Sequence, residues 1–246
     1  MKPEERFLLH MSKVTVKLLR GIDEKPIPTG ARCGFITKRN GRLVVVTAAH
    51  KADLDDHWFV QTALTHEGQT LYVPVKGLMF WKRLNLDRPD HIEDIDLAWG
   101  ELDMLALEQQ LKAKGTAKDA PLGWMPYIGP IEAPEKEEAY GFSGVGAIDI
   151  VPEFGKMYQT PAYELYLEYS GDNTERDLYE FAMARKHQGD AYYEGASGSP
   201  IAGPDGKIVS ILLGSDEERT VLWGAKLLDY ERLWDVDFAA PVVQQQ

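Results

Sequence analysis

The stretch Gly195-Ala196-Ser197-Gly198-Ser199-Pro200 decides how the rest of this 246-residue sequence is interpreted, because it sets a serine among residues that let the backbone turn sharply. The backbone angles open to glycine allow the N–H of Gly195, together with that of Ser197, to point at one spot beside the hydroxyl. Two N–H groups aimed in this way stabilise a developing oxyanion. An ordinary Gly-Ser loop is the alternative interpretation of this segment alone, since both residue types are common in turns.

Two upstream segments supply side chains that could act with this serine. The first, Val44-Val45-Val46-Thr47-Ala48-Ala49-His50, is an apolar strand that delivers a histidine, and a neutral imidazole can take a serine proton and return it to a leaving group. In the second, Asp94-Ile95-Asp96-Leu97-Ala98-Trp99, strand alternation puts both carboxylates on the same face. Either could accept the N–H of His50, so alternation leaves the choice between Asp94 and Asp96 open.

In chain order, the motifs Thr-Ala-Ala-His at 47–50, Asp-Leu-Ala at 96–98 and Gly-x-Ser-Gly-x-Pro at 195–200 resemble those of the chymotrypsin-fold, or trypsin-like, serine peptidases. The resemblance is strongest to the bacterial single-domain and HtrA-like branches. It implies an all-β protein of two antiparallel six-stranded barrels with a short C-terminal helix. It also implies that Ser197 is the nucleophile and His50 the general base and acid. Asp96, whose Asp-Leu-Ala context matches the family pattern, would orient His50, while Gly195 and Ser197 would supply the oxyanion N–H groups.

Several positions depart from the family pattern or concern specificity. Ala196 stands where many secreted members have an Asp that pairs with a newly cut N-terminus, so activation by N-terminal insertion is not expected. Leu213 replaces a frequent Ser, which leaves the backbone of Leu213, Gly214 and Ser215 to hold a peptide as an added strand.

The base of the specificity pocket is expected six residues before Ser197, at Ala191, with Glu194 near the rim. This composition favours a small or apolar substrate residue before the scissile bond. A shift of the loop by one residue would instead bring Asp190 into the pocket and favour Arg or Lys.

The chain is predicted to divide near residue 116, into an N-terminal lobe (1–115) with His50 and Asp96 and a C-terminal lobe (116–246) with Ser197. A helical pattern over 102–114 ends near Gly115, and a Pro-, Gly-, Lys- and Glu-rich connection follows. Asn40-Gly41 predicts a tight hairpin, and Leu227, Tyr230, Leu233 and Trp234 predict the C-terminal helix. Strands are predicted at 14–19, 33–37, 43–46, 58–62, 71–76, 95–99, 138–140, 147–151, 164–169, 178–184, 208–213 and 220–226.

Composition excludes several partners. Lys and Arg total 27 against 39 Asp and Glu, a net charge of −12, which repels nucleic-acid phosphates and anionic membrane surfaces. No apolar run approaches the roughly 18 residues of a membrane span, and the first residues do not form a secretory signal. Cys33 is the only cysteine and is expected to be a buried small residue. These features favour a cytoplasmic protein.

No cofactor or metal is expected, because His57, His66 and His91 lack ligand spacing. An α/β-hydrolase is excluded, since the last histidine, His187, precedes Ser197. The sequence therefore predicts a serine endopeptidase that acts on a protein or peptide through an acyl-enzyme intermediate. The alternative is a catalytically silent relative that uses the same cleft to bind a peptide or protein, and a regulatory protein partner is also left open.

Overall fold

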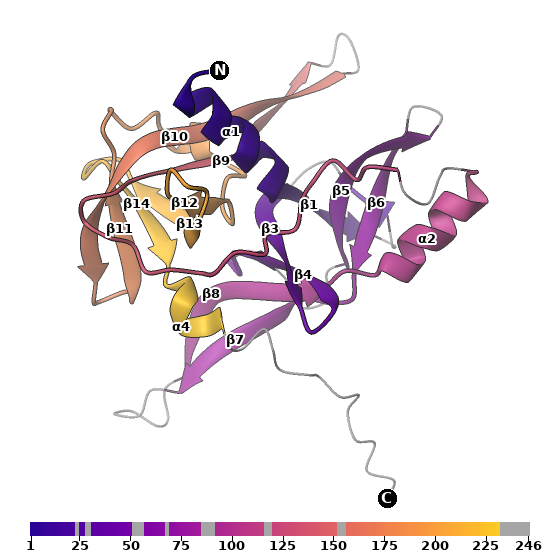
Figure 1. The fold of residues 1–246 in the computed structure, drawn as a ribbon, viewed down its shortest axis with the longest axis horizontal. Helices are drawn as coiled ribbons and strands as arrows, with labels where there is room; N and C mark the ends of the chain where they lie inside the picture. The colour runs from indigo at the N-terminus through magenta and orange to yellow at the C-terminus, as the bar shows by residue number, and fades with distance from the viewer. Residues whose placement is uncertain are drawn as a thin grey trace, which may run out of the picture.

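The computed structural model describes residues 1–22, 25–27, 31–50, 57–66, 69–84, 92–115, 120–151 and 156–231. Two antiparallel β-sheets dominate it, and short helices lie at their edges (Figure 1). His91, and the Leu233 and Trp234 of the predicted C-terminal helix, lie outside the described residues. The side chain of Asp94 is not described either. Among the residues that the structure describes, no helix is both long and apolar enough to cross a membrane.

The first sheet contains eight strands, seven of them in the order β6-β5-β1-β3-β4-β8-β7, with β2 paired to β1. The predicted hairpin at Asn40-Gly41 is confirmed: it joins β3 to β4, and both residues have positive φ, at 49° and 79°. The strands are β1 (Thr15–Ile22), β2 (Lys25–Pro26), β3 (Arg32–Arg39), β4 (Arg42–Thr47), β5 (His57–His66), β6 (Gln69–Val75), β7 (Met79–Leu84) and β8 (Ile92–Glu101).

The second sheet is a closed barrel of six strands in the order β10-β11-β14-β13-β12-β9. Its strands are β9 (Ala139–Val151), β10 (Lys156–Asn173), β11 (Leu178–Ala182), β12 (Pro200–Ala202), β13 (Ile208–Asp216) and β14 (Val221–Ala225). The predicted runs 138–140 and 147–151 belong to one continuous strand, because the chain stays extended between them: Gly141 pairs with Ala202 of β12 and Gly144 with Ala162 of β10.

The all-β class is therefore confirmed, with one closed six-stranded barrel. The first sheet differs from the predicted six strands, because β2 and β7 add to it. Each of these two strands is held by pairing to a strand that neighbours it in sequence, β1 or β8, and alternation within the segment itself does not report that pairing.

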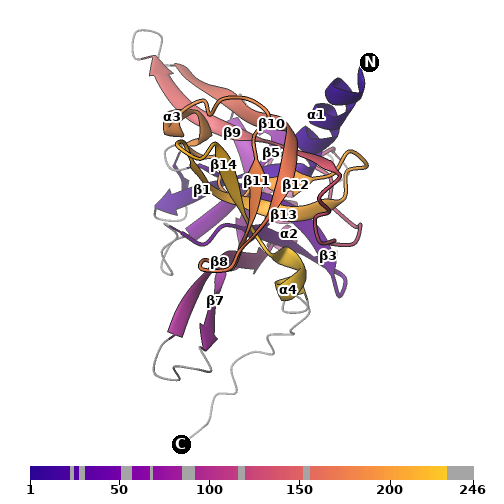
Figure 2. The same ribbon diagram turned by 90° about the vertical axis from the view of Figure 1, so that its left-hand side faces the viewer.

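Four helices accompany the sheets in the described part of the chain: α1 (Pro3–Val14), α2 (Met104–Ala113), α3 (Asp190–Tyr193) and α4 (Leu227–Tyr230). The predicted helix over 102–114 corresponds to α2, whose N-cap Asp103 accepts the N–H of Ala106 at 3.0 Å. The short α4 follows the last strand and buries Leu227 and Tyr230. Helix α1 was not predicted; it packs along β9 through its buried face, and α3 lies beside the same strand (Figure 2).

One hydrophobic core joins the two sheets. Val46 and Leu97 from the first sheet share a buried cluster with Ile211 and Leu213 from the second. Residues 120–138 cross between the sheets, and Tyr127 links both: its N–H donates to Ile36 O at 2.6 Å, and its hydroxyl accepts the N–H of Ile208 at 3.2 Å. The ends of β4, β8 and β13 therefore have fixed places relative to one another.

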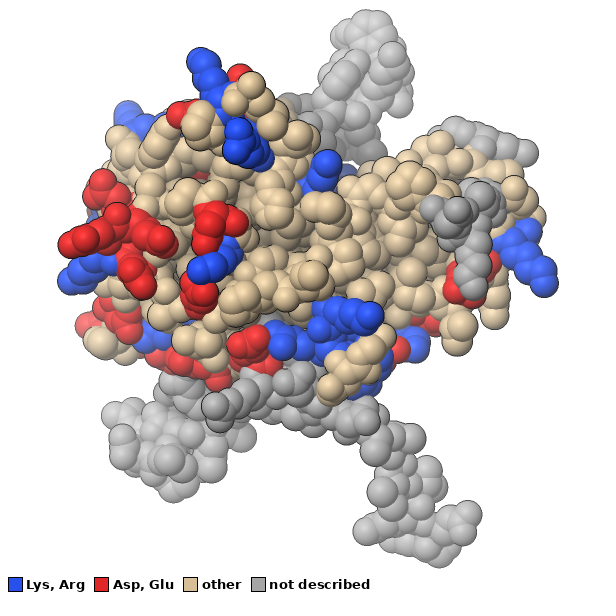
Figure 3. All heavy atoms as spheres, in the orientation of Figure 1, with Lys and Arg blue, Asp and Glu red and all other residues tan. Residues whose placement is uncertain are grey.

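Acidic side chains gather on one part of the surface (Figure 3). On the face shown in Figure 3, Asp and Glu side chains gather over the second barrel, with Lys and Arg scattered among them. This face does not present the continuous basic stripe that a nucleic-acid backbone requires.

Candidate active site

His50, Asp96 and Ser197 meet at the junction of the two sheets. Nε2 of His50 lies 3.0 Å from Oγ of Ser197, and Nδ1 of His50 lies 2.6 Å from Oδ2 of Asp96. The register of the first sheet explains the second contact, because Thr47 of β4 pairs with Ala98 of β8, and His50 follows β4 closely. The backbone N–H of His50 also donates to Oδ1 of Asp96 at 2.6 Å. Of the two carboxylates that alternation left open, Asp96 contacts His50, and the side chain of Asp94 lies outside what the structure describes.

Backbone hydrogen bonds from both sheets hold the serine loop. The N–H of Cys33 in β3 donates to Ser197 O at 3.0 Å, and the N–H of Gly198 donates to Leu212 O in β13 at 2.7 Å. Gly198 has a φ of 88°, and a Cβ there would lie only 2.0 Å from Cys33 O. Only glycine fits at this position, because the loop is pressed between one strand of each sheet.

Two N–H groups of the loop are available to a ligand. The N–H groups of Ala196 and Ser199 donate to Tyr193 O and Ala196 O, both at 2.9 Å. By contrast, the N–H groups of Gly195 and Ser197 have no acceptor among the residues that the structure describes. Gly195 has a φ of 90°, a conformation that favours glycine. Two such donors beside a serine hydroxyl are the arrangement that a developing oxyanion requires.

The site is open to solvent on one side. The side chains of His50 and Asp96 are 33% and 31% exposed, so protons can be exchanged with water. Directly behind the serine loop, Cys33 is completely buried, and its thiol sulfur accepts the N–H of Val145 at 3.0 Å. Burial raises the pKa of the Cys33 thiol, which keeps it protonated and unreactive. Cys33 is thus a packing residue, as predicted.

A cleft of about 700 Å³ contains the site. The predicted Ala191, Glu194, Gly214 and Ser215 line it together with His50 and Ser197. Asp190 also lines the cleft, so the structure leaves both specificity alternatives in place. The side chain of Leu213 is not among the lining groups; it is 9% exposed and belongs to the core between the sheets, which leaves its backbone for a peptide.

The residues that line the cleft on the side of the first sheet were not predicted from the sequence. Arg20, Arg32 and Trp58 are among them, and the guanidinium of Arg32 lies 4.8 Å from the centre of the Trp58 ring. These residues come from β1, β3 and β5, and no local motif marks them. Only the pairing of β1 with both neighbours brings them together.

One cluster in the described part of the chain has the composition of a metal site. Ligand atoms of His187, Asp190 and Glu217 lie within 4.8 Å of one another. However, Nδ1 of His187 accepts the N–H of Gly189 at 2.9 Å, so the proton of the neutral ring is on Nε2 and neither nitrogen offers a free lone pair. The donor set does not favour a metal, and the prediction that none is needed stays a prediction.

No family model matches this chain, and no curated protein matches it in sequence. Its fold is similar to that of neuropsin, a serine protease expressed in the limbic system of mouse brain, with a TM-score of 0.56 and 15% identity over 92% of this chain and 94% of that one. It is also similar to the serine endoprotease from Yersinia pestis, with a TM-score of 0.51 and 13% identity over 96% of this chain and 66% of that one. At such identities the likeness establishes the chymotrypsin-like fold alone.

Proposed function

We propose that the chain is a serine endopeptidase in which Ser197 is the nucleophile, His50 the general base and acid, and Asp96 the group that orients His50. The contact of 3.0 Å between His50 Nε2 and Ser197 Oγ, with Asp96 on the other ring nitrogen, carries this proposal. An Asp carboxylate at Nδ1 keeps a proton there, which leaves a lone pair on Nε2 directed at the serine hydroxyl.

The geometry supports a two-step acyl transfer. Ser197 Oγ attacks the substrate carbonyl carbon while its proton passes to His50 Nε2, and the N–H groups of Gly195 and Ser197 bind the resulting oxyanion. His50 then gives this proton to the departing amine nitrogen, and the C–N bond breaks to leave an ester on Ser197. In the second step, water loses a proton to His50 and attacks the ester. The proton returns to Ser197 Oγ as the acid product leaves.

A peptide or protein is the proposed substrate. Gly214 and Ser215 of β13 line the cleft, and we propose that the backbone from Leu213 to Ser215 pairs with an extended chain. Ala191 and Glu194 also line the cleft and are proposed to contact the residue before the scissile bond. We propose a small or apolar residue at this position. A preference for Arg or Lys is the competing outcome, because Asp190 lines the same cleft.

The two sheets are proposed to be the two lobes of one catalytic unit, residues 1–115 and 116–246, as in an HtrA-like protease domain. His50 and Asp96 come from the first lobe and Ser197 from the second. Closure of the first sheet into a barrel is supported by the antiparallel bridge between Val75, at the end of β6, and Leu102, directly after β8.

A fluorophosphonate probe tests the proposal, because it reacts covalently only with an activated serine. The wild type is expected to be labelled, and Ser197→Ala and His50→Ala to lose the label. Ser170→Ala, which removes an exposed hydroxyl in β10, is the matched control and should be labelled like the wild type. An unlabelled wild type with a cooperative unfolding transition would refute the proposal and favour the peptide-binding alternative.

A further inference from the structure

The segment that leads into the serine loop is built on a buried carboxylate. Residues 185–196 contain α3 and form one wall of the cleft through Asp190, Ala191 and Glu194. On the other side, this segment contacts β10, where Glu164 is only 1% exposed although it carries a carboxylate. A buried carboxylate needs hydrogen-bond donors, since its desolvation otherwise costs several kcal/mol. The hydrogen-bond donors to Glu164 therefore show which segment of the chain this carboxylate holds in place.

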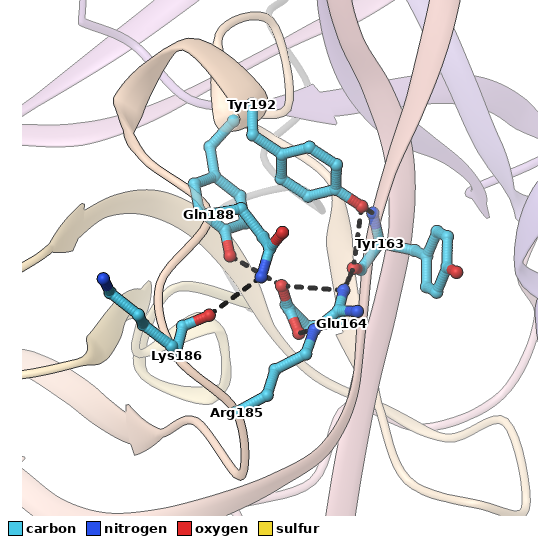
Figure 4. A network of polar contacts seen from close by, with 7 residues as sticks. Tyr163, Glu164, Arg185, Lys186, Gln188 and Tyr192 are labelled. Carbon is cyan, nitrogen blue, oxygen red and sulfur yellow. Dashed lines mark hydrogen bonds and ion pairs between the residues drawn. The ribbon is translucent and has the colours of Figure 1, made fainter.

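The side-chain donors to Glu164 in the described part of the chain come from this one segment. Arg185 Nε donates to Oε2 at 2.7 Å and a second Arg185 nitrogen donates to Oε1 at 3.1 Å, which makes a two-pronged ion pair (Figure 4). The Tyr193 hydroxyl donates to Oε1 at 2.6 Å. Burial, followed by this hydrogen bond, raises the pKa of Tyr193, so its hydroxyl stays a donor throughout the pH range of interest. Glu164 thus joins both ends of the segment.

The neighbouring residue of β10 strengthens the attachment. Tyr163 O accepts a further hydrogen bond from Arg185 at 2.9 Å, and Tyr163 N–H donates to the Tyr192 hydroxyl at 3.1 Å. Figure 4 shows Arg185 and Tyr192 converging on this pair of strand residues. Two successive residues of β10 consequently hold two successive tyrosines of α3 and the arginine before it.

Tyr193 transmits this attachment to the serine loop. Its carbonyl accepts the N–H of Ala196 at 2.9 Å, and the turn that this bond closes contains Gly195, with its φ of 90°. Ala196 itself is completely buried and apolar, so it offers no charge that could fix the loop. The position of Tyr193 therefore determines where the N–H of Gly195 points.

We propose that Glu164 is a positioning residue for the proposed reaction, which holds Tyr193 and Arg185 so that the Gly195 N–H stays aimed at the substrate oxyanion. This proposal rests on the proposed function. The residue touches neither substrate nor the reacting groups, and it acts through Tyr193. Its loss is expected to lower the rate of the chemical step more than it weakens substrate binding.

Glu164→Gln is the sharpest test, because it keeps the shape of the side chain. Whichever way the amide is turned, its NH₂ group faces an N–H of Arg185, so the two-pronged pair is lost. The loss of one oxyanion donor costs about 10² to 10³ in rate, so the rate constant of fluorophosphonate labelling should fall by up to that factor. With a peptide substrate, kcat should fall more than KM rises. Tyr193→Phe, which removes only the hydroxyl, should show the same effect more weakly and serves if Glu164→Gln does not fold.

The matched control is Glu180→Gln. Glu180 also pairs with an arginine, Arg219, within the same barrel, and among the described residues its side chain bonds to Asn173 and Arg219 and to no residue of the segment 185–196. Assays are run well below the unfolding midpoint of each variant, so that a loss of stability alone does not change the rate. Labelling of Glu180→Gln should stay within about twofold of the wild type. An equal rate for Glu164→Gln and wild type would overturn the proposal.

Hydrogen exchange separates this proposal from the proposed function. Amides of residues 187–199 should exchange faster in Glu164→Gln than in the wild type, and at the wild-type rate in Glu180→Gln. If the wild type is not labelled by the probe, the proposed function fails, and exchange still decides whether Glu164 holds the loop. Unchanged exchange in Glu164→Gln would show that it does not.

Discussion

Replacement of Asp96 by asparagine tests the orientation of His50 more strictly than removal of the side chain, because the two residues have the same shape. In the native site, Oδ1 of Asp96 accepts the backbone N–H of His50 and Oδ2 accepts the ring Nδ1–H, both at 2.6 Å. An amide has only one acceptor to offer to these two donors. The substitution therefore forces a choice between them.

The backbone N–H of His50 determines the outcome of that choice. This N–H is always a donor, so the amide oxygen of the substituted side chain must face it. The NH₂ group of the amide is then placed against Nδ1 of His50. The ring then accepts at Nδ1 and carries its proton on Nε2, where it points at Ser197 Oγ, 3.0 Å away. In this tautomer, His50 cannot take the serine proton.

The expected loss is about 10⁴ in rate, or about 5 kcal/mol at the reacting serine. Stability should change by about 1 kcal/mol or less, because both side chains are roughly one third exposed and their attraction is screened. The assay is the rate constant of fluorophosphonate labelling, with thermal unfolding measured in parallel. Asp205→Asn, in an exposed turn, is the control and should react like the wild type. An Asp96→Asn rate within tenfold of the wild type would refute this account of His50.

Three further outcomes are expected. Gly198→Ala should lower the free energy of unfolding by about 3 kcal/mol and abolish fluorophosphonate labelling, because the added Cβ would lie 2.0 Å from Cys33 O. An unchanged unfolding midpoint would contradict this prediction. Cys33 should resist iodoacetamide in the native protein and react in urea, since burial raises its pKa; fast native alkylation would contradict this. Hydrogen bonds from Arg219 lower the pKa of Glu180 in the folded protein. The ionised carboxylate therefore stabilises the fold at pH values above the pKa that Glu180 has in the unfolded chain, and this stabilisation is lost on acidification. Glu180→Gln should therefore show a shallower fall in unfolding midpoint from about pH 5 to about pH 3 than the wild type, and parallel curves would exclude this contribution.

Short motifs made part of the architecture predictable. Asn40-Gly41 predicts its hairpin because the turn requires positive φ at both positions, a requirement that the two residue types express locally. The same holds for α2, whose N-cap and apolar spacing lie within one segment. Helix α1 carried comparable signals, with Pro3 at its start, Glu4 and Glu5 in its first turn and Lys13 in its last, and it could have been predicted from them.

Other features depend on contacts that no local pattern contains. Alternation predicts Asp94 and Asp96 on the same strand face and therefore could not choose between them. The register of β4 against β8 brings Asp96 to His50, a contact between strands that alternation does not contain. Glu164 lies in a strand where charged residues are normally solvated, and its burial depends on Arg185 and Tyr193, which lie 21 and 29 residues away in the sequence. The strand pattern alone gives no sign that this carboxylate is buried against Arg185 and Tyr193.

The distance between His50 and Ser197 depends on the packing of the whole molecule, since each residue belongs to a different sheet. Cys33 is central to that packing: its N–H donates to Ser197 O and its sulfur accepts the N–H of Val145, so β3 of the first sheet is tied to two segments of the second. The shared core then fixes the angle between the sheets, because Val46 and Leu213 are buried in the same cluster. A motif can therefore indicate which side chains should meet. Their separation of 3.0 Å follows from the shared apolar core and from the hydrogen bonds of Cys33, which together hold the two sheets in place.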